Sequence, residues 1–108
     1  MSTQTVSSAP QPTVSAEVVA FAREQGVEQC LPGLIALSHR TFPSAAHFGI
    51  LLEEDPEIAG DRHIVFRLAV PLDVPQSLEA DRQWIEGLGR LCPKTLMCVF
   101  RLSLDLVA

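Results

Sequence analysis

Acidic residues gather between positions 53 and 63, and they are the residues in this chain whose types and spacing could do chemistry. The carboxylates are Glu53, Glu54, Asp55, Glu57 and Asp61, and His63 follows them. Paired carboxylates can act as acid and base, and oxygen-rich loops bind Ca²⁺ or Mg²⁺. The spacing does not match an EF-hand loop, so a solvated hairpin turn is the better explanation. If the stretch is nevertheless a catalytic or metal-binding site, Glu54, Asp55 and His63 are its candidate residues.

The histidines and cysteines show no metal-binding spacing. They are His39, His47, His63, Cys30, Cys92 and Cys98. In the strand register given below, His47 and His63 lie at opposite ends of a hairpin, too far apart to share an ion. Cys92 and Cys98 are spaced too widely for a zinc motif, and we expect Cys98 to face the core. The chain has only three cysteines, and a small, odd number of cysteines is typical of reduced thiols. We therefore expect surface histidines, structural cysteines, no metal and no cofactor.

Helical spacing with end signals predicts three helices. They span 16–25, 32–42 and 74–91. Ser15 suits an N-cap, Gly26 a C-terminal stop, and Asp73 with Gln76 resembles a capping box. The apolar stripe expected to face the core from the third helix consists of Leu78, Ile85, Leu88 and Cys92, with Trp84 and Leu91 beside it. Gly87, inside this helix, either permits close helix packing or ends the helix early.

Two-residue periodicity predicts three strands, at 47–54, 63–70 and 96–106. The short loop between the first two predicts an antiparallel hairpin. If even-numbered residues face the core, Leu52 pairs with Ile64. Ile50 pairs with Phe66 in the same register. We expect the third strand to return beside the first. The predicted fold is therefore α+β, with element order α-α-β-β-α-β and a three-stranded antiparallel sheet in the order 2-1-3, covered by helices on one face.

The other face of this sheet is the main candidate for a binding surface, because a fully solvated face would carry more Thr, Lys and Glu. The candidate interface residues are Gly49, Leu51, Val65, Arg67, Ala69, Met97, Val99 and Arg101. An apolar patch with a polar rim is typical of interfaces, and an ordinary exposed face is the alternative. Face-to-face packing of two copies requires Arg67 and Arg101 at the rim, because burying an unpaired arginine is costly.

Length and composition fit one small domain. The chain has 108 residues, of which 47% are hydrophobic, enough for a single core. Residues 1–15 are mostly Ser, Thr, Gln and Pro, so we expect a disordered tail followed by a single domain over 16–108. A net charge of −5 with scattered basic residues disfavours nucleic-acid binding. Neither a membrane-spanning run nor a secretory signal is recognisable, so we expect a cytoplasmic protein.

Four segments resemble a family of small bacterial proteins without an assigned activity. They are LLEEDPEI at 51–58, DRHIVFRLAVP at 61–71, RQW at 82–84 and CPKTLMCVFRL at 92–102. The resemblance runs from about Glu17 to Leu104. It implies a bacterial origin and no catalytic assignment, and it supplies no functional residues.

The sequence contains no phosphate-binding loop and none of the common hydrolase, metalloprotease or kinase motifs. We therefore expect a small non-enzymatic protein–protein interaction or regulatory module. Its partner is another protein or a second copy in a homodimer. The alternative is a small enzyme or metal-binding protein with a site near the acidic hairpin 53–63.

Overall fold

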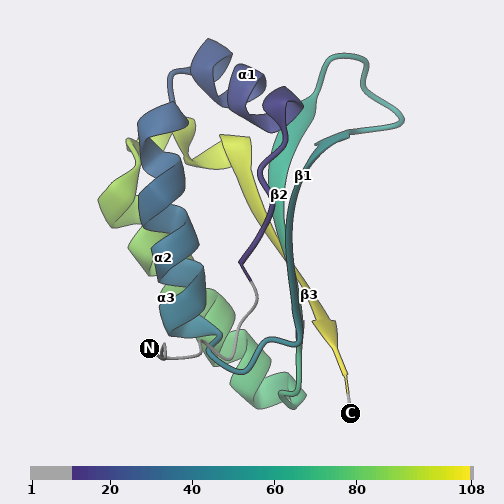
Figure 1. Ribbon diagram of the computed structural model, residues 1–108, viewed down its shortest axis with the longest axis vertical. Helices are drawn as coiled ribbons and strands as arrows, with labels where there is room; N and C mark the ends of the chain where they lie inside the picture. The colour runs from purple at the N-terminus through teal and green to yellow at the C-terminus, as the bar shows by residue number, and fades with distance from the viewer. Residues whose placement is uncertain (1–10, 108) are drawn as a thin grey trace, which may run out of the picture.

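The computed structural model describes residues 11–107 and contains the expected order of helices and strands, with two additional 3₁₀-helices. The elements are α1 (Ala16–Gln25), η1 (Glu28–Cys30), α2 (Leu31–Thr41), β1 (His47–Glu54), β2 (Arg62–Val70), α3 (Val74–Leu91), η2 (Lys94–Val99) and β3 (Phe100–Leu106). Figure 1 shows two layers, with α2 and α3 on one side and the sheet on the other. Residues 1–10 of the expected tail lie outside the described residues. Val14, from its last part, packs against the core.

The predicted ends of α1 and α3 are confirmed, whereas α2 begins and ends one residue earlier than expected. The Ser15 hydroxyl accepts a hydrogen bond from the Val18 amide at 3.1 Å. Gly26 ends α1 at a φ of 76°, in the left-handed region where a side chain is costly. Asp73 and Gln76 form a complete capping box at the start of α3. These caps could be predicted correctly because each depends on residues within one turn of helix.

The hairpin register is also confirmed. β1 and β2 pair antiparallel, with Leu52 opposite Ile64, Ile50 opposite Phe66, and Glu53 opposite His63. Even-numbered residues of both strands face the helices: Phe48 and Ile50 of β1 and Ile64, Phe66, Leu68 and Val70 of β2 are all buried. The two-residue period therefore fixes which side of the hairpin meets the core.

The expected position of the third strand is wrong. β3 lies beside β2 and parallel to it, so the strand order is β1-β2-β3 and the sheet is mixed. Helix α3 carries the chain back along the sheet, and a strand that follows such a crossover can join either flank of the hairpin. Joining β2 makes β2 the central strand, and Val65 on its second face is accordingly only 4% exposed.

The start of the third strand also differs from the expectation. Residues 94–99 form the 3₁₀-helix η2, and β3 begins only at Phe100. The Leu96 amide donates to the Pro93 carbonyl at 2.9 Å, which closes the first turn. Leu96 is partly buried and Val99 is buried, so a spacing of three serves the core here as well as a spacing of two would.

Helix α3 buries only part of the expected stripe: Leu88 and Cys92 are buried as predicted, but Leu78 and Ile85 are not. Its buried residues are Ser77, Ala80, Trp84, Gly87 and Leu88. Leu78 and Ile85 are instead exposed, whereas Trp84 is fully buried. The Trp84 ring lies 5.6 Å from that of Phe66, between α3 and the central strand. The small residues Ser77, Ala80 and Gly87 let α3 approach its neighbours closely. The side of the helix that carries them therefore faces the core, rather than the side that carries Leu78 and Ile85.

Glycines set the spacing between α2 and α3. A Cβ atom added to Gly87 would lie 2.6 Å from a Leu37 methyl carbon, and one added to Gly33 would lie 3.0 Å from a Leu91 methyl carbon. In each helix, a glycine thus leaves room for a leucine of the other helix: Leu37 packs on Gly87, and Leu91 packs on Gly33. Of the two alternatives for Gly87, the structure shows close packing, since α3 continues past it to Leu91.

Candidate functional site

The acidic hairpin and His63 do come together at one end of the sheet. Glu54, Asp55 and His63 line a pocket of about 150 Å³, and Arg101 reaches it from β3. An Nη atom of Arg101 lies 3.1 Å from His63 Nε2, and Asp61 Oδ1 lies 3.6 Å from the same nitrogen. The pocket therefore combines an imidazole, a guanidinium and several carboxylates.

Part of the hydrogen-bonding capacity of these carboxylates is already used within the turn. Asp55 Oδ1 accepts from the Glu57 amide at 2.8 Å, and Glu54 Oε2 accepts from the Gly60 amide at 3.0 Å. Gly60 has a φ of 82°, which the turn requires. Within residues 11–107, no three histidine, cysteine or acidic side chains are placed to hold a metal ion. The geometry supports the hairpin-turn explanation of the acidic run.

The uncovered face of the sheet differs from the expected apolar patch. Gly49, Leu51 and Ala69 are half-buried on it, but Arg67 lies on the central strand and pairs with Glu53 at 3.0 Å. Arginine is therefore in the middle of the face rather than only at its rim. The condition for face-to-face packing of two copies is not met.

Two of the expected interface residues do not belong to this face at all. Met97 and Val99 lie in η2 rather than in a strand. The Met97 side chain approaches Gly89 of α3, and Val99 is buried in the core. The prediction failed because it extended the two-residue period of β3 backwards through a 3₁₀-helix.

No protein-family model, curated protein or solved structure matches the chain. Within the described residues, no helix is long and apolar enough to cross a membrane.

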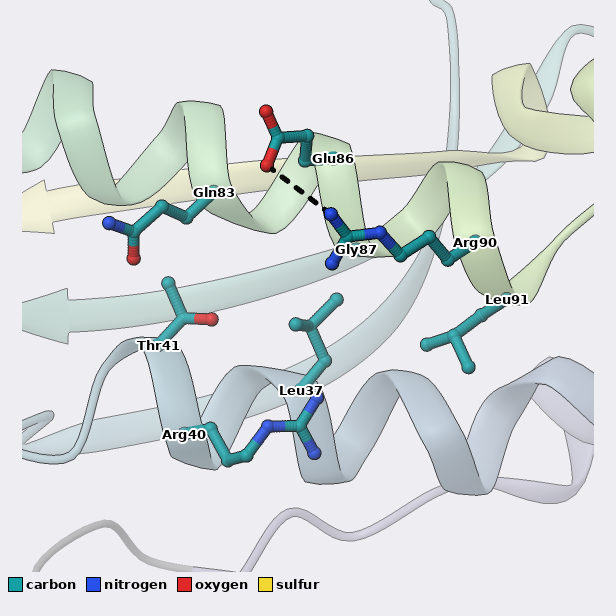
Figure 2. A pocket seen from close by; sticks show the side chains of 8 residues that line it. All are labelled: Leu37, Arg40, Thr41, Gln83, Glu86, Gly87, Arg90 and Leu91. Carbon is teal, nitrogen blue, oxygen red and sulfur yellow. Dashed lines mark ion pairs between the residues drawn. The ribbon is translucent and has the colours of Figure 1, made fainter.

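A larger groove runs between α2 and α3, and sequence reasoning did not identify it. It has a volume of about 420 Å³, and Figure 2 shows its lining residues, which come from both helices: Leu37, Arg40, Thr41, Gln83, Glu86, Gly87, Arg90 and Leu91. Leu37 against Gly87 forms its floor. Arg40 and Arg90 reach it from opposite helices, and Arg90 lies 3.8 Å from Glu86. The groove is open and polar at its rim.

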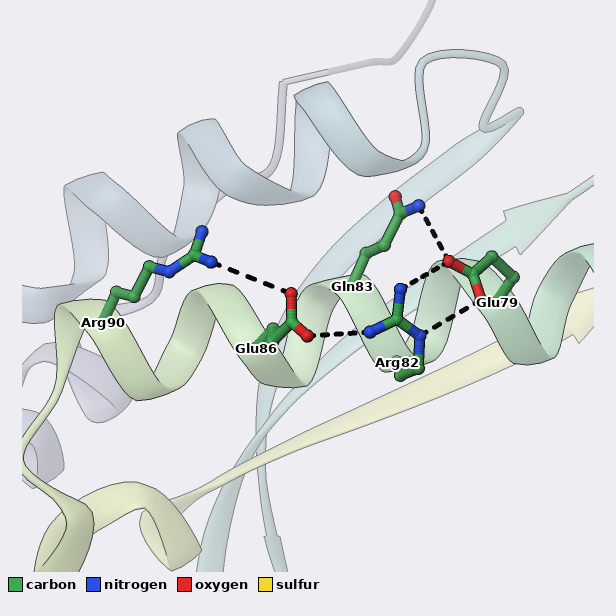
Figure 3. Close-up of polar contacts among 5 residues, drawn as sticks. All are labelled: Glu79, Arg82, Gln83, Glu86 and Arg90. Atoms are coloured by element: carbon green, nitrogen blue, oxygen red, sulfur yellow. Dashed lines mark hydrogen bonds and ion pairs between the residues drawn. The ribbon is translucent and has the colours of Figure 1, made fainter.

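The outer side of α3 beside this groove is a chain of ion pairs, shown in Figure 3. Arg82 bonds Glu79 at 2.6 Å and Glu86 at 2.7 Å. The hydrogen bond from Arg82 lowers the pKa of Glu79, and the bond to Glu79 raises the pKa of Arg82. All of these side chains are exposed, so the pairs contribute little to stability. This side of α3 is a solvated surface.

The flank of α3 that turns away from α2 exposes three large apolar side chains, with the partly buried Asp81 among them. Val74, Leu78 and Ile85 are spaced at i, i+4 and i+11, which puts them on one side of the helix. Their exposed fractions are 59%, 63% and 45%. Because α2 occupies the opposite flank and α3 packs over β2 and β3, this flank lies on the side of β3. Sequence reasoning found Leu78 and Ile85 but assigned them to the core.

The apolar surface continues onto β3, which is an edge strand. Its helix-facing residues are Leu102, Leu104 and Leu106, of which the first two are partly buried and Leu106 is 43% exposed. Within residues 11–107, the outer edge of β3 pairs with no other strand. We call this combination the β3 edge surface; it consists of the outer edge of β3, the three leucines, and Val74, Leu78 and Ile85 of α3.

Of the thiols and the remaining histidines, Cys30, Cys92 and His39 contact the core, whereas Cys98 and His47 are exposed. Cys30 and Cys92 are buried, and burial, followed by the contact with Cys30, raises the pKa of Cys92 to about 12. Cys98 was expected to face the core but is exposed in η2. His47 is exposed as expected. His39 was expected at the surface but is only partly exposed: its ring nitrogens are buried, and the ring meets Phe48 edge-on with centroids 5.4 Å apart.

Proposed function

We propose that this chain is a small non-enzymatic protein–protein interaction module that binds its partner through the β3 edge surface. The observation that carries the proposal is the coincidence of an unpaired strand edge with a row of exposed apolar side chains on the neighbouring helix flank. An unpaired edge offers backbone N–H and C=O groups to an incoming strand. The exposed leucine and isoleucine side chains supply apolar area that a partner would remove from water.

The other edge of the sheet supports this choice by contrast. β1 is also an edge strand, but of its helix-facing apolar residues, Phe48 and Ile50 are 3% and 6% exposed, and only Leu52 is partly buried. Docking a strand there would bury little additional apolar surface. At β3, Leu102 and Leu104 are only partly buried and Leu106 is 43% exposed, so an added strand with its own cover would remove more apolar surface from water there.

A matched pair of substitutions tests the proposal. Leu78→Glu puts a charge into the β3 edge surface, whereas Ile58→Glu puts the same charge at a similarly exposed position in the hairpin loop, 56% against 63% exposed. Both side chains are outside the core, so neither change should disturb folding. After cross-linking in native cells, wild-type and Ile58→Glu protein should be recovered with the same stoichiometric partner, and Leu78→Glu without it. Equal recovery of that partner by all three proteins would refute the proposal.

A second candidate function is favoured by the hairpin pocket, which brings Glu54, Asp55 and His63 beside Arg101. In this proposal the chain is a small enzyme or metal-binding protein, with His63 as acid or base. Because a ligand that binds only the folded state raises its stability, melting temperatures with and without divalent cations or small carboxylates test it. Stabilisation that His63→Ala abolishes would favour this candidate, and unchanged melting temperatures would count against it.

A further inference from the structure

We propose that the partner is a second copy of this chain, with the two β3 strands pairing antiparallel about a twofold axis at Ser103 to give a continuous six-stranded sheet. This inference rests on the proposed function, because it names the occupant of the same β3 edge surface. It differs from face-to-face packing of two sheets, since the copies meet side by side and leave the uncovered face free.

The hydrogen-bonding direction along β3 determines which residues face the free edge. The Val107 amide donates to the Val70 carbonyl at 2.9 Å, and Val70 is in register with Leu106. In a parallel ladder, alternate residues direct both backbone groups to the same side. Odd-numbered residues of β3 therefore bond to β2. Leu102 and Leu104 direct their N–H and C=O groups outward, where a second strand could bond to them.

An antiparallel pair centred on Ser103 satisfies this alternation. It places Leu102 opposite Leu104 of the other copy, as a hydrogen-bonded pair formed by the outward-facing groups. Arg101 then lies opposite Asp105 of the other copy, as a non-hydrogen-bonded pair, in which side chains come closest. Shifting the register by two residues in either direction would keep the hydrogen bonds but lose both charge pairs. The sequence Arg-Leu-Ser-Leu-Asp at 101–105 is thus complementary to itself in charge and in apolar pattern.

Both charged groups are available for such a pair. Arg101 and Asp105 are exposed on the uncovered side of the sheet. Arg101 contacts His63 through one Nη atom at 3.1 Å. A guanidinium carries five N–H donors, so the remaining ones can still reach a carboxylate. No arginine would be buried without a partner.

The helix side of the sheet would also bring apolar side chains of the two copies together. A twofold axis perpendicular to the sheet keeps the helices of both copies on the same face. The flanks of α3 that carry Leu78 and Ile85 would then face each other across the axis, above the leucines of the two β3 strands. Pairing of the two β3 edges would thus also remove the exposed side chains of Leu78 and Ile85 from water.

Charge reversal tests the register. Because the axis repeats every contact, Arg101→Asp converts two attractive pairs into two repulsive ones and should raise the dimer dissociation constant by about 10- to 100-fold. The double variant Arg101→Asp/Asp105→Arg restores both pairs and should dimerise like the wild type. Arg40→Asp makes the same change of charge on exposed α2 and should have no effect. Sedimentation velocity measures all four proteins.

A cysteine at the axis tests the same register independently. In a Cys98→Ser background, Ser103→Cys should oxidise to a disulfide-linked dimer, because the two residues 103 are directly opposite. Arg101→Cys should not, since its counterpart is residue 105 of the other copy. A wild-type protein that is monomeric at high micromolar concentration, a dimer indifferent to charge reversal, or equal cross-linking of both cysteine variants would overturn the inference. If the protein is monomeric yet Leu78→Glu still loses a different co-purified chain, self-pairing fails and the proposed function stands.

Discussion

The buried hydrogen bond between α3 and α2 allows a quantitative prediction. Trp84 Nε1 donates to Ser38 Oγ at 2.9 Å, and the Ser38 hydroxyl donates to the Leu34 carbonyl at 2.8 Å. Neither Trp84 nor Ser38 has measurable exposure. Ser38→Ala therefore removes the acceptor of an indole N–H group that water cannot reach.

The magnitude follows from two opposing effects. A buried donor without an acceptor costs about 1–3 kcal/mol, and alanine returns roughly 0.5 kcal/mol through its higher helix propensity. We expect a net loss of about 0.5–2.5 kcal/mol in the free energy of unfolding, which corresponds to a fall in melting temperature of roughly 2–20 °C for a domain of this size. Ser77→Ala is the control, because the buried Ser77 hydroxyl donates only to the Val74 carbonyl and no side chain depends on it.

A double-mutant cycle isolates the hydrogen bond from other effects of the substitution. In a Trp84→Phe background the indole N–H is gone, so Ser38→Ala should cost less than about 0.5 kcal/mol. Urea unfolding followed by far-ultraviolet circular dichroism suits all four proteins, because Trp84 is the only tryptophan and fluorescence would be lost in two of them. An equal cost of Ser38→Ala in both backgrounds would refute the reasoning.

Other features lead to shorter predictions. Gly87→Ala should lower the unfolding free energy by about 1–3 kcal/mol, because its methyl group would meet Leu37; unchanged stability in urea would contradict the close packing. Asp73→Ala removes the capping box of α3 and should cost about 1 kcal/mol in the same assay. Cys98 should be the one thiol that a disulfide reagent modifies rapidly in the folded protein, with Cys92 reacting only on unfolding. The folded protein keeps the Cys92 proton to about pH 12, whereas the unfolded chain loses it near pH 9. The free energy of unfolding should therefore decrease as pH rises through this interval. In urea unfolding at alkaline pH, a Cys92→Ala variant should show a smaller decrease.

Local structure could be predicted from the sequence because its determinants are close together in the chain. The caps at Ser15, Gly26 and Asp73 involve neighbouring residues, and the hairpin register follows from a short loop and a strict alternation. The third strand could not be placed this way. Its position depends on the choice between the two edges of the hairpin, and the apolar pattern of even-numbered residues is satisfied at both.

The candidate site was predicted less well, for two physical reasons. Hydrophobicity alone ranks Leu78 and Ile85 above Ser77, Ala80 and Gly87 as core residues. Close packing against α2 reverses this ranking, because only small side chains fit there. The sequence prediction also assigned the arginines to a rim, and it failed because the central strand turned out to be β2, which carries Arg67.

The position of β3 has a consequence for the order in which the sheet opens. β1 is tied to β2 by a short turn, whereas β3 is tied to it through the whole of α3, so more chain entropy is gained when β3 detaches. Within residues 11–107, β3, like β1, bonds along one edge only. Local opening should therefore begin there, and the amide protons of β3 should exchange with solvent before those of β2. A strand that pairs with the outer edge of β3 would hold β3 along both edges, and it would therefore slow the exchange of all its amide protons.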